Sequence, residues 1–270
     1  MSMLQDLIRS RLRGGAALPE LANPAAVGDV AQGKEYIDEN GEKQTGTLDV
    51  GVNVLNHCKM IRFDGLYPSD TPNVYLPEVT SAEKLFYNNM KYTEVTVTFN
   101  RETPKVTNLS GLVLHYAYGS RLRKLTINGK LSAVTTYVGL LYRNYYCTGI
   151  YGDPLDFSSV TNADGSNYWG AAQIQHEAQD FYVRYVPNSL HVNHMLAAFP
   201  SFSDDSLVSI ANGLRAGANT ITLHADMKAR AAALVGTVRN NGTYDEFTID
   251  ANGTTTLTQF ITTVKGWTIA

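Results

Sequence analysis

The sequence is poor in charged residues and has no excess of either sign. Asp, Glu, Lys and Arg make up 17% of the 270 residues, whereas an average soluble domain has roughly 25%. Basic residues number 22 and acidic residues 25, which gives a net charge of −3. Few charges together with 10% aromatic residues argue against intrinsic disorder. Because there is no positive excess, we expect no binding to nucleic acid and no attraction to anionic lipid.

Long apolar runs, a secretion signal and a cysteine framework are also lacking. No apolar run approaches the roughly 18 residues of a transmembrane helix, so we expect no membrane insertion. Charges interrupt the apolar pattern of residues 1–15, which differs from a secretion signal. Cys58 and Cys147 can form one bridge at most. These absences predict a soluble protein. Its 16 tyrosines further indicate that it contains β-structure.

An internal repeat is the strongest positive signal. The dipeptide Val-Thr recurs at spacings of 27, 28 and 26 residues, beginning at Val79, Val106, Val134 and Val160. Neighbouring positions align with the same period, namely Leu85 with Leu112 and Leu140, Phe86 with Val113 and Leu141, Gly111 with Gly139, Tyr118 with Tyr146, and Gly119 with Cys147. Chance repetition of one dipeptide would seldom align the flanking apolar positions as well, so we infer a true repeat.

Each repeat unit contains one strand pattern and one less regular segment. Residues 81–90 and 109–118 have apolar residues three and four apart, as in a short helix or an irregular turn. Apolar residues then alternate with threonines, with Val95, Val97 and Phe99 in one unit and Leu125 and Ile127 in the next. This period of two predicts a strand with one buried face. The aligned apolar positions should form the core, in particular Val106, Leu112, Leu125, Ile127, Val134 and Leu140.

Such units bury their apolar residues only by stacking on their neighbours. The predicted fold class is therefore α/β, a leucine-rich-repeat-like solenoid with irregular short helices on the convex side, preceded by an N-terminal helix and a β-hairpin. We expect an N-terminal segment over residues 1–50 and the solenoid over 51–270, with repeats at about 79–200 and a C-terminal cap at 201–270. One continuous parallel sheet should contain the strands around Val97, Leu125, Ile150, Tyr182 and Ile221.

Local signals predict further elements on both sides of the repeats. Upstream, we expect a strand at 59–63 and a proline-containing loop at 67–77. Downstream, we expect in order a strand at 181–186, a helix at 203–214, a strand at 220–224, a helix at 226–235 with Asp226 as its N-cap, turns at Asn241-Gly242 and Asn252-Gly253, a helix at 257–264 and a strand at 267–269.

Residues 1–50 differ in kind from the repeats. The pattern predicts an amphipathic helix over 1–13, an Ala-, Pro- and Gly-rich linker over 16–33, and a hairpin over 33–48. None of these can bury a core by itself, so we expect this segment to contact other subunits. The candidate assembly contacts are Leu4, Leu7, Ile8 and Leu12 on one face of the helix, and Tyr36 and Ile37 in the hairpin. In the alternative arrangement, the helix folds back on its own solenoid.

Histidine and cysteine do not combine into a metal site. His57-Cys58 is an adjacent pair, and His191 and His194 are three residues apart. No second cysteine or carboxylate completes the ligand set that zinc needs. Cys147 aligns with a glycine of the repeat, which favours a buried small side chain over a reactive thiol. We predict no metal and no cofactor.

Three aspartates are candidates for the two carboxylates of a glycoside hydrolase. Asp153, Asp156 and Asp164 lie close together in sequence, and glycoside cleavage uses two carboxylates. Their surroundings are rich in Gly, Ser and Asn, where aspartate normally forms turns and caps. We therefore predict turn and cap roles and no catalytic residue.

Tyrosines gather within residues 137–169 together with amides and carboxylates. This composition suits recognition of a glycan or a protein, since ring faces are apolar and ring edges can carry hydrogen-bonding groups. The candidate binding surface consists of Tyr142, Tyr145, Tyr151, Tyr168, Trp169 and Asn144. In the alternative, the rings fill the core of a repeat that is short of leucine, and the alignment with Tyr118 favours a core position for Tyr146.

Three parts of the sequence carry a resemblance to known proteins. Residues 29–34 (Asp-Val-Ala-Gln-Gly-Lys) and 46–48 (Gly-Thr-Leu) resemble a hairpin motif common in tail, baseplate and fibre proteins of bacteriophages. The coils over 79–200 look like the BspA-type leucine-rich repeats of phage and bacterial surface proteins. The C-terminal runs resemble the ending of phage-encoded members of that group, at 207–214, 222–225 and 266–270. The sequence departs from that ending at 240–255, and the hairpin motif occurs once where tandem copies are common.

The resemblance implies a structural protein of the phage tail tip, baseplate or fibre. Its N-terminal segment would bind other tail or baseplate proteins, its repeat domain would be displayed for host attachment, and it would join the virion in the host cytoplasm. A homo-oligomer is expected, with a trimer preferred by analogy with fibre proteins. One alternative is an adhesin or receptor-binding module that recognises a host surface glycan or protein. The other is a glycan hydrolase, for which the resemblance supplies no catalytic residue.

Overall fold

The computed structural model describes residues 35–37, 43–45, 70–87, 91–114, 121–141, 144, 146–161, 180–197 and 201–270. The chain forms two compact units, Met1–Asn53 and Val54–Ala270. In the first unit, β1 (Glu35–Ile37) and β2 (Lys43–Thr45) pair antiparallel, with Tyr36 opposite Gln44. The predicted hairpin is therefore confirmed. The predicted helix at 1–13, the linker at 16–33 and the strand at 59–63 lie outside the described residues.

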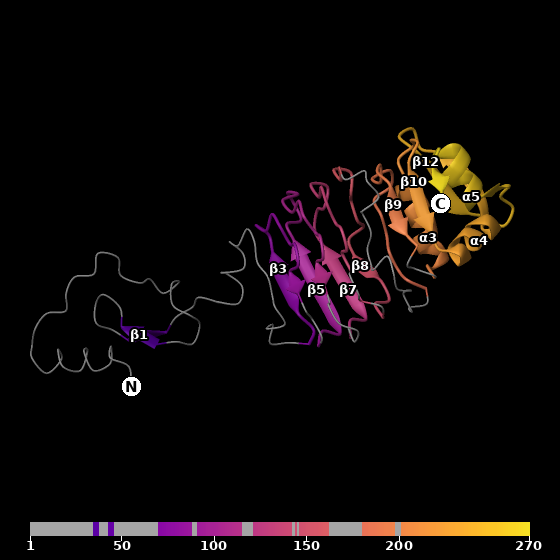
Figure 1. Cartoon of the computed structure of the whole chain (residues 1–270). Helices are drawn as coiled ribbons and strands as arrows, with labels where there is room; N and C mark the ends of the chain where they lie inside the picture. Colours follow the sequence, from indigo (N-terminus) through magenta and orange to yellow (C-terminus); the bar gives the residue numbers. More distant parts are fainter. Residues whose placement is uncertain are drawn as a thin grey trace, which may run out of the picture. The chain divides into compact units, whose positions relative to one another are not determined.

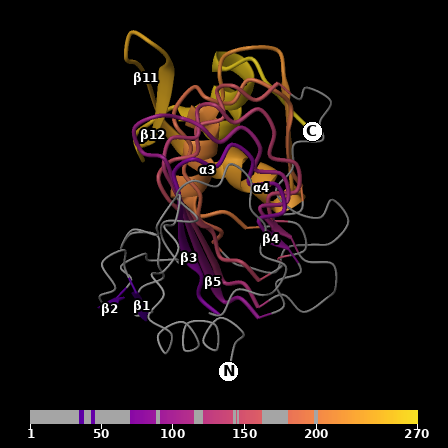
Figure 2. The ribbon, with the colours of Figure 1, turned by 90° about the vertical axis from the view of Figure 1, so that its left-hand side faces the viewer.

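The second unit contains a β-solenoid of about four turns. Its main sheet has four parallel strands in the order β3-β5-β7-β8, one from each successive coil. The strands are β3 (Asn73–Leu76), β5 (Glu94–Phe99), β7 (Lys124–Asn128) and β8 (Ile150–Gly152). Figure 1 shows them side by side, and Figure 2, which looks along the stack, shows the coils one behind another. The repeat solenoid that we predicted is present.

Alternating side chains explain why these strands pair. The apolar residues of β5 and β7 are at most 1% exposed, and the threonines between them face the opposite side. The register sets Val95 beside Leu125 and Val97 beside Ile127, so each coil continues the core of the one before it. The predicted core is confirmed throughout, at Val106, Leu112, Leu125, Ile127, Val134 and Leu140.

The strand β3 lies where we predicted a loop. Pro72 and Pro77 flank this strand, and flanking prolines favour the prediction of a loop. The residues between them nevertheless alternate, with Val74 and Leu76 buried. Because Pro72 precedes the strand, its missing N–H costs the sheet nothing. The Pro72 carbonyl accepts a hydrogen bond from the Thr96 amide at 2.8 Å.

The less regular segments of the coils form turns and a second parallel ladder. Ser81, Asn108 and Thr136 form successive bridges, and β4 (Phe86–Tyr87) pairs with β6 (Val113–Leu114). Of the two forms predicted for these segments, a short helix or an irregular turn, the described parts at 81–87 and 109–114 have the turn. Every second amide donates to the next coil, as when the Phe86 amide donates to the Leu112 carbonyl at 2.9 Å, and this pattern is incompatible with a helix.

The Val-Thr dipeptides stack on one another from coil to coil. Each valine is at most 1% exposed, whereas the threonines are exposed. The Thr107 amide and hydroxyl both donate to the Thr80 carbonyl, at 2.8 and 2.9 Å, and Thr135 bonds to Thr107 in the same way. The threonine hydroxyl therefore adds a second hydrogen bond to the same carbonyl, which explains why this residue type recurs.

The C-terminal part forms a cap with its own small sheets. A parallel sheet has the order β14-β10-β9, and an antiparallel sheet has the order β12-β11-β13. The strands are β9 (His194–Leu196), β10 (Thr220–Leu223), β11 (Val235–Asn240), β12 (Asp245–Ile249), β13 (Thr255–Thr256) and β14 (Thr268–Ile269). The helices are α3 (Asp204–Gly213), α4 (Ala225–Ala233), α5 (Leu257–Gln259) and a π-helical turn, Phe260–Val264.

Four predictions about this part need correction. No strand forms at 181–186, where Phe181, Tyr182 and Tyr185 form only isolated bridges. Tyr182 forms a parallel bridge with Gly149, but Ile221 belongs to the separate sheet β14-β10-β9, so the parallel sheet is not continuous. The N-cap of α4 is His224, whose side chain accepts from the Asp226 amide, and not Asp226 itself. The last helix turns into a π-helix after three residues. Within the described ranges, no helix has the length and apolarity that crossing a membrane requires.

Candidate functional site

The structure places part of the predicted binding surface. Tyr151 lies on the outer face of β8 and is partly exposed. Asn144 is only 1% exposed, and its Nδ2 donates to the Val113 carbonyl at 2.6 Å. The predicted place of Asn144 on the binding surface is therefore wrong. Its side chain is buried because it supplies the hydrogen bond that a buried backbone carbonyl needs. The other predicted residues lie outside the described ones, namely Tyr142, Tyr145, Tyr168 and Trp169.

Four of the six predicted assembly contacts also lie outside the described part of the chain. Leu4, Leu7, Ile8 and Leu12 lie outside the described residues. Tyr36 and Ile37 belong to β1, opposite Gln44 and Lys43 of β2.

The outer face of the main sheet is polar in its middle strands and has tyrosines on both edge strands, Tyr75 on β3 and Tyr151 on β8. The register forms rows across the strands, such as Thr96 and Thr126 leading to Tyr151. In the next row Asn128 lies beside Thr98, and its Nδ2 donates to the threonine hydroxyl at 3.3 Å. Such a face offers hydroxyls and amides over β5 and β7 and tyrosine rings over β3 and β8.

Two tyrosine rings and a lysine gather over β8. The rings of Tyr151 and Tyr182 are stacked, with centroids 4.9 Å apart and planes 14° apart. Lys124 Nζ lies 5.2 Å from the centroid of Tyr151. Gly149 makes room for this arrangement, because a Cβ there would lie 2.8 Å from the Tyr182 Cβ and 2.6 Å from its carbonyl oxygen. Tyr151 therefore has a cationic neighbour from β7 and an aromatic neighbour from the following coil.

A second cation–tyrosine pair adjoins the first. The guanidinium carbon of Arg123 lies 4.8 Å from the ring centroid of Tyr146, which is 38% exposed. The core position favoured for Tyr146 was therefore wrong. Thr148 joins the two pairs, since its hydroxyl donates to the Arg123 carbonyl at 2.8 Å and lies 3.4 Å from the Tyr151 hydroxyl. We call Arg123, Lys124, Tyr146, Tyr151 and Tyr182 the cation–tyrosine patch.

The patch carries net positive charge. In the described part of the chain, no carboxylate lies within ion-pair distance of Arg123 or Lys124. Glu94 is opposite Lys124 in the register but forms no ion pair with it. Sequence reasoning missed both cations and Tyr182. The predicted alternation at Leu125 and Ile127 does not reach Lys124, and the pairing of Lys124 with a tyrosine depends on how the coils stack.

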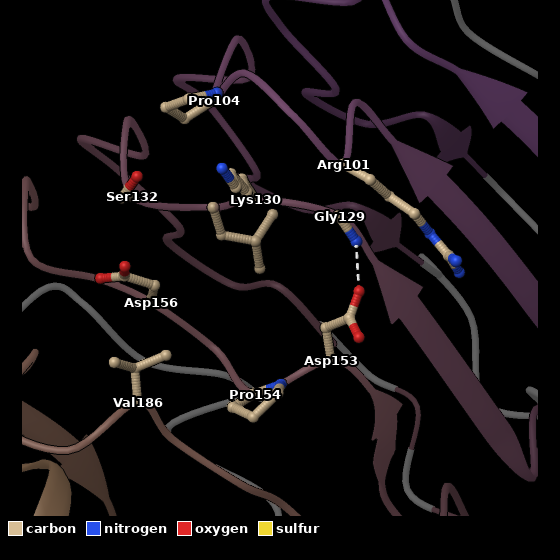
Figure 3. Close-up of a pocket in the computed structure, with 10 residues that line it drawn as sticks. Arg101, Pro104, Gly129, Lys130, Ser132, Asp153, Pro154, Asp156 and Val186 are labelled. Carbon is tan, nitrogen blue, oxygen red and sulfur yellow. Dashed lines mark hydrogen bonds between the residues drawn. The ribbon is translucent and has the colours of Figure 1, made fainter.

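An open groove of about 640 Å³ lies at the carboxyl ends of β5, β7 and β8 (Figure 3). Asp153 and Asp156, two of the three candidate aspartates, both line it. Asp153 accepts from the Gly129 amide at 2.8 Å, and Asp156 accepts from the Ser158 amide at 3.1 Å. The local bond of Asp156 agrees with the predicted turn role, whereas Asp153 bonds to the backbone of the preceding coil. Asp164 lies outside the described residues.

His194 and Cys147 are both buried in the core. His194 is buried between two tyrosine hydroxyls, those of Tyr137 and Tyr185. Cys147 is buried, as predicted, and burial raises the pKa of its thiol to about 12. Over the described ranges, no three side chains of His, Cys, Asp or Glu cluster in a way that could hold a metal ion.

Comparisons with protein families, with curated proteins and with solved structures each find no match for this chain.

Proposed function

We propose that this protein is a structural protein of a bacteriophage tail tip, baseplate or fibre, and that it displays its solenoid for attachment to the host. The observation that carries the proposal is the outer face of the main sheet, where partly exposed threonines lie beside the cation–tyrosine patch. A rigid stack of coils with such a face suits binding to an extended surface ligand.

The resemblances of the sequence support the phage assignment. The hairpin formed by β1 and β2 lies within the phage-type motif at residues 29–48. In this proposal residues 1–50 anchor the chain to neighbouring tail proteins or to identical chains, and the coils are of the BspA leucine-rich-repeat type. The stacked Val-Thr dipeptides and the buried aligned leucines are consistent with a repeat of that kind.

Purified particles test the location of the protein. The full-length chain, expressed from its own genome, is expected in tail-containing particles isolated on a density gradient, where immunogold labels one end of the tail. A deletion of residues 1–16 should keep the solenoid folded, as measured by circular dichroism, and should fail to enter particles. Absence of the full chain from particles, or normal incorporation of the truncated chain, would contradict the anchored virion role.

An adhesin outside a virion is the second candidate, and the same surface favours it. The open sheet face would serve a cell-surface adhesin as well as a tail protein. In that case cell fractionation should find the chain in the host envelope, and purified particles should lack it.

A further inference from the structure

We infer that the cation–tyrosine patch binds an acidic polysaccharide whose sugars carry carboxylates. This inference rests on the proposed attachment function and names the class of ligand. The patch lies on an open sheet face, so its occupant is an extended polymer that crosses the strands.

The charges of the patch are free to meet a ligand. Arg123 and Lys124 are both exposed, and within the described structure neither forms an ion pair with a carboxylate. Each cation lies near a tyrosine ring. The guanidinium carbon of Arg123 is 4.8 Å from the centroid of Tyr146, and Nζ of Lys124 is 5.2 Å from the centroid of Tyr151. The rings restrict the positions of the cations before any ligand arrives, which lowers the entropy lost on binding. An anion is therefore the complementary partner.

The spacing of ring and charge favours an acidic sugar over other anions. A uronic acid carries its carboxylate on the sugar ring itself, so one residue can place its ring against a tyrosine and its carboxylate against the neighbouring cation. The guanidinium of Arg123 can bind that carboxylate through two parallel hydrogen bonds. The hydroxyls of Thr148 and Tyr151, which lie 3.4 Å apart, add partners for sugar hydroxyls.

Nucleic acid fits the surface less well. Binding to a phosphate backbone uses a long track of basic residues, whereas Glu94 lies opposite Lys124 on the adjoining strand. The uncharged threonines Thr96 and Thr126 form a separate row of the sheet, which leads to Tyr151. A polymer with one charge on each sugar matches two adjacent cations followed by hydroxyls.

Calorimetry on the full-length chain tests the inference. The probes are oligogalacturonate and its methyl ester, which has the same sugars without the charge. We expect binding to the acid and none to the ester. Arg123→Ala and Lys124→Ala should each weaken binding by about tenfold, and the double variant should abolish it. Raising the salt concentration should also weaken binding.

Lys228→Ala is the matched control, because it removes one exposed lysine of helix α4 outside the patch. Its affinity should equal that of the unmodified chain. Melting curves should show all variants folded, since the substituted side chains are exposed. Equal binding of acid and ester, an equal effect of Lys228→Ala, or equally tight binding of inorganic polyphosphate or duplex DNA would overturn the inference.

The outcomes separate this inference from the proposed function. A chain that is found in tail particles but does not bind the acid overturns the polysaccharide site alone. A chain that binds the acid but is absent from particles keeps the site and overturns the virion role.

Discussion

The Tyr137 hydroxyl lies 2.5 Å from Nδ1 of His194, 57 residues further along the chain. The other ring nitrogen of His194, Nε2, lies 3.0 Å from the Tyr185 hydroxyl. All three side chains are at most 3% exposed. In a neutral imidazole one nitrogen donates and the other accepts, so the two hydroxyls satisfy the ring completely. This contact links a coil of the solenoid to β9 of the C-terminal cap.

Removing the Tyr137 hydroxyl should destabilise the protein. Tyr137→Phe leaves a buried nitrogen of His194 without its partner, which costs about 1–3 kcal/mol. Unfolding in urea, followed by circular dichroism, measures the change in the free energy of unfolding. Tyr75→Phe is the control, because Tyr75 is 47% exposed, and it should change stability by less than about 0.5 kcal/mol. Equal effects of the two variants would show that the buried contact adds nothing.

The aligned leucines should be essential to the coils. Leu112→Ala and Leu140→Ala each empty a fully buried position and should cost about 2–5 kcal/mol. Glu102→Ala, an exposed substitution in the same region, should be within about 0.5 kcal/mol of the unmodified chain. Denaturant titration measures all three. A cost below about 1 kcal/mol at Leu140 would be inconsistent with its place in the core.

One turn position of the repeat requires a left-handed backbone. Gly111 and Gly139 have φ of 58° and 65° there, and the first coil has Lys84 with φ of 52°. Gly111→Ala introduces a Cβ in this conformation and should cost about 1–2 kcal/mol. Lys84→Ala already starts from a residue with a Cβ and should change stability by less than about 0.5 kcal/mol. Thermal melting of both variants tests this, and equal losses would contradict the assignment.

Stability should fall at alkaline pH because of Cys147. Burial raises the pKa of its thiol from 9.0 to about 12, so the unfolded chain loses this proton first. The stability contribution is complete below pH 9 and is lost as pH rises toward 12, by about 1.4 kcal/mol for each pH unit in that window. Burial also raises the pKa of Tyr137 above its ordinary value of 10.0. The loss of stability due to Tyr137 therefore begins near pH 10.

Cys147→Ala isolates the contribution of the thiol. The variant starts less stable because of the cavity, but its free energy of unfolding should fall less between pH 9 and 10.5 than that of the unmodified chain. Urea titrations at several pH values measure the difference. Parallel curves for the two proteins would show that the thiol ionises equally in the folded and unfolded states.

Much of the solenoid follows from patterns within single segments. The period-two alternation at Val95, Val97 and Phe99 predicts which side chains are buried, since a strand points successive side chains to opposite faces. The Val-Thr spacing predicts that the coils stack in register. The serine at 203 and the Asn-Gly at 241 predict a helix start and a turn, because capping and turn chemistry depend on neighbouring residues alone.

The site depends on contacts between coils, which no local pattern contains. Tyr182 stacks on Tyr151 because Gly149, which has no side chain, leaves room for Tyr182 beside it. Asn144 is buried because a carbonyl of the preceding coil, that of Val113, needs a donor. Ile221 joins a separate sheet because its partners are β9 and β14 rather than the repeats. The sequence alone determines which face of each strand is buried, whereas packing between distant segments decides which exposed residues meet on the outer face.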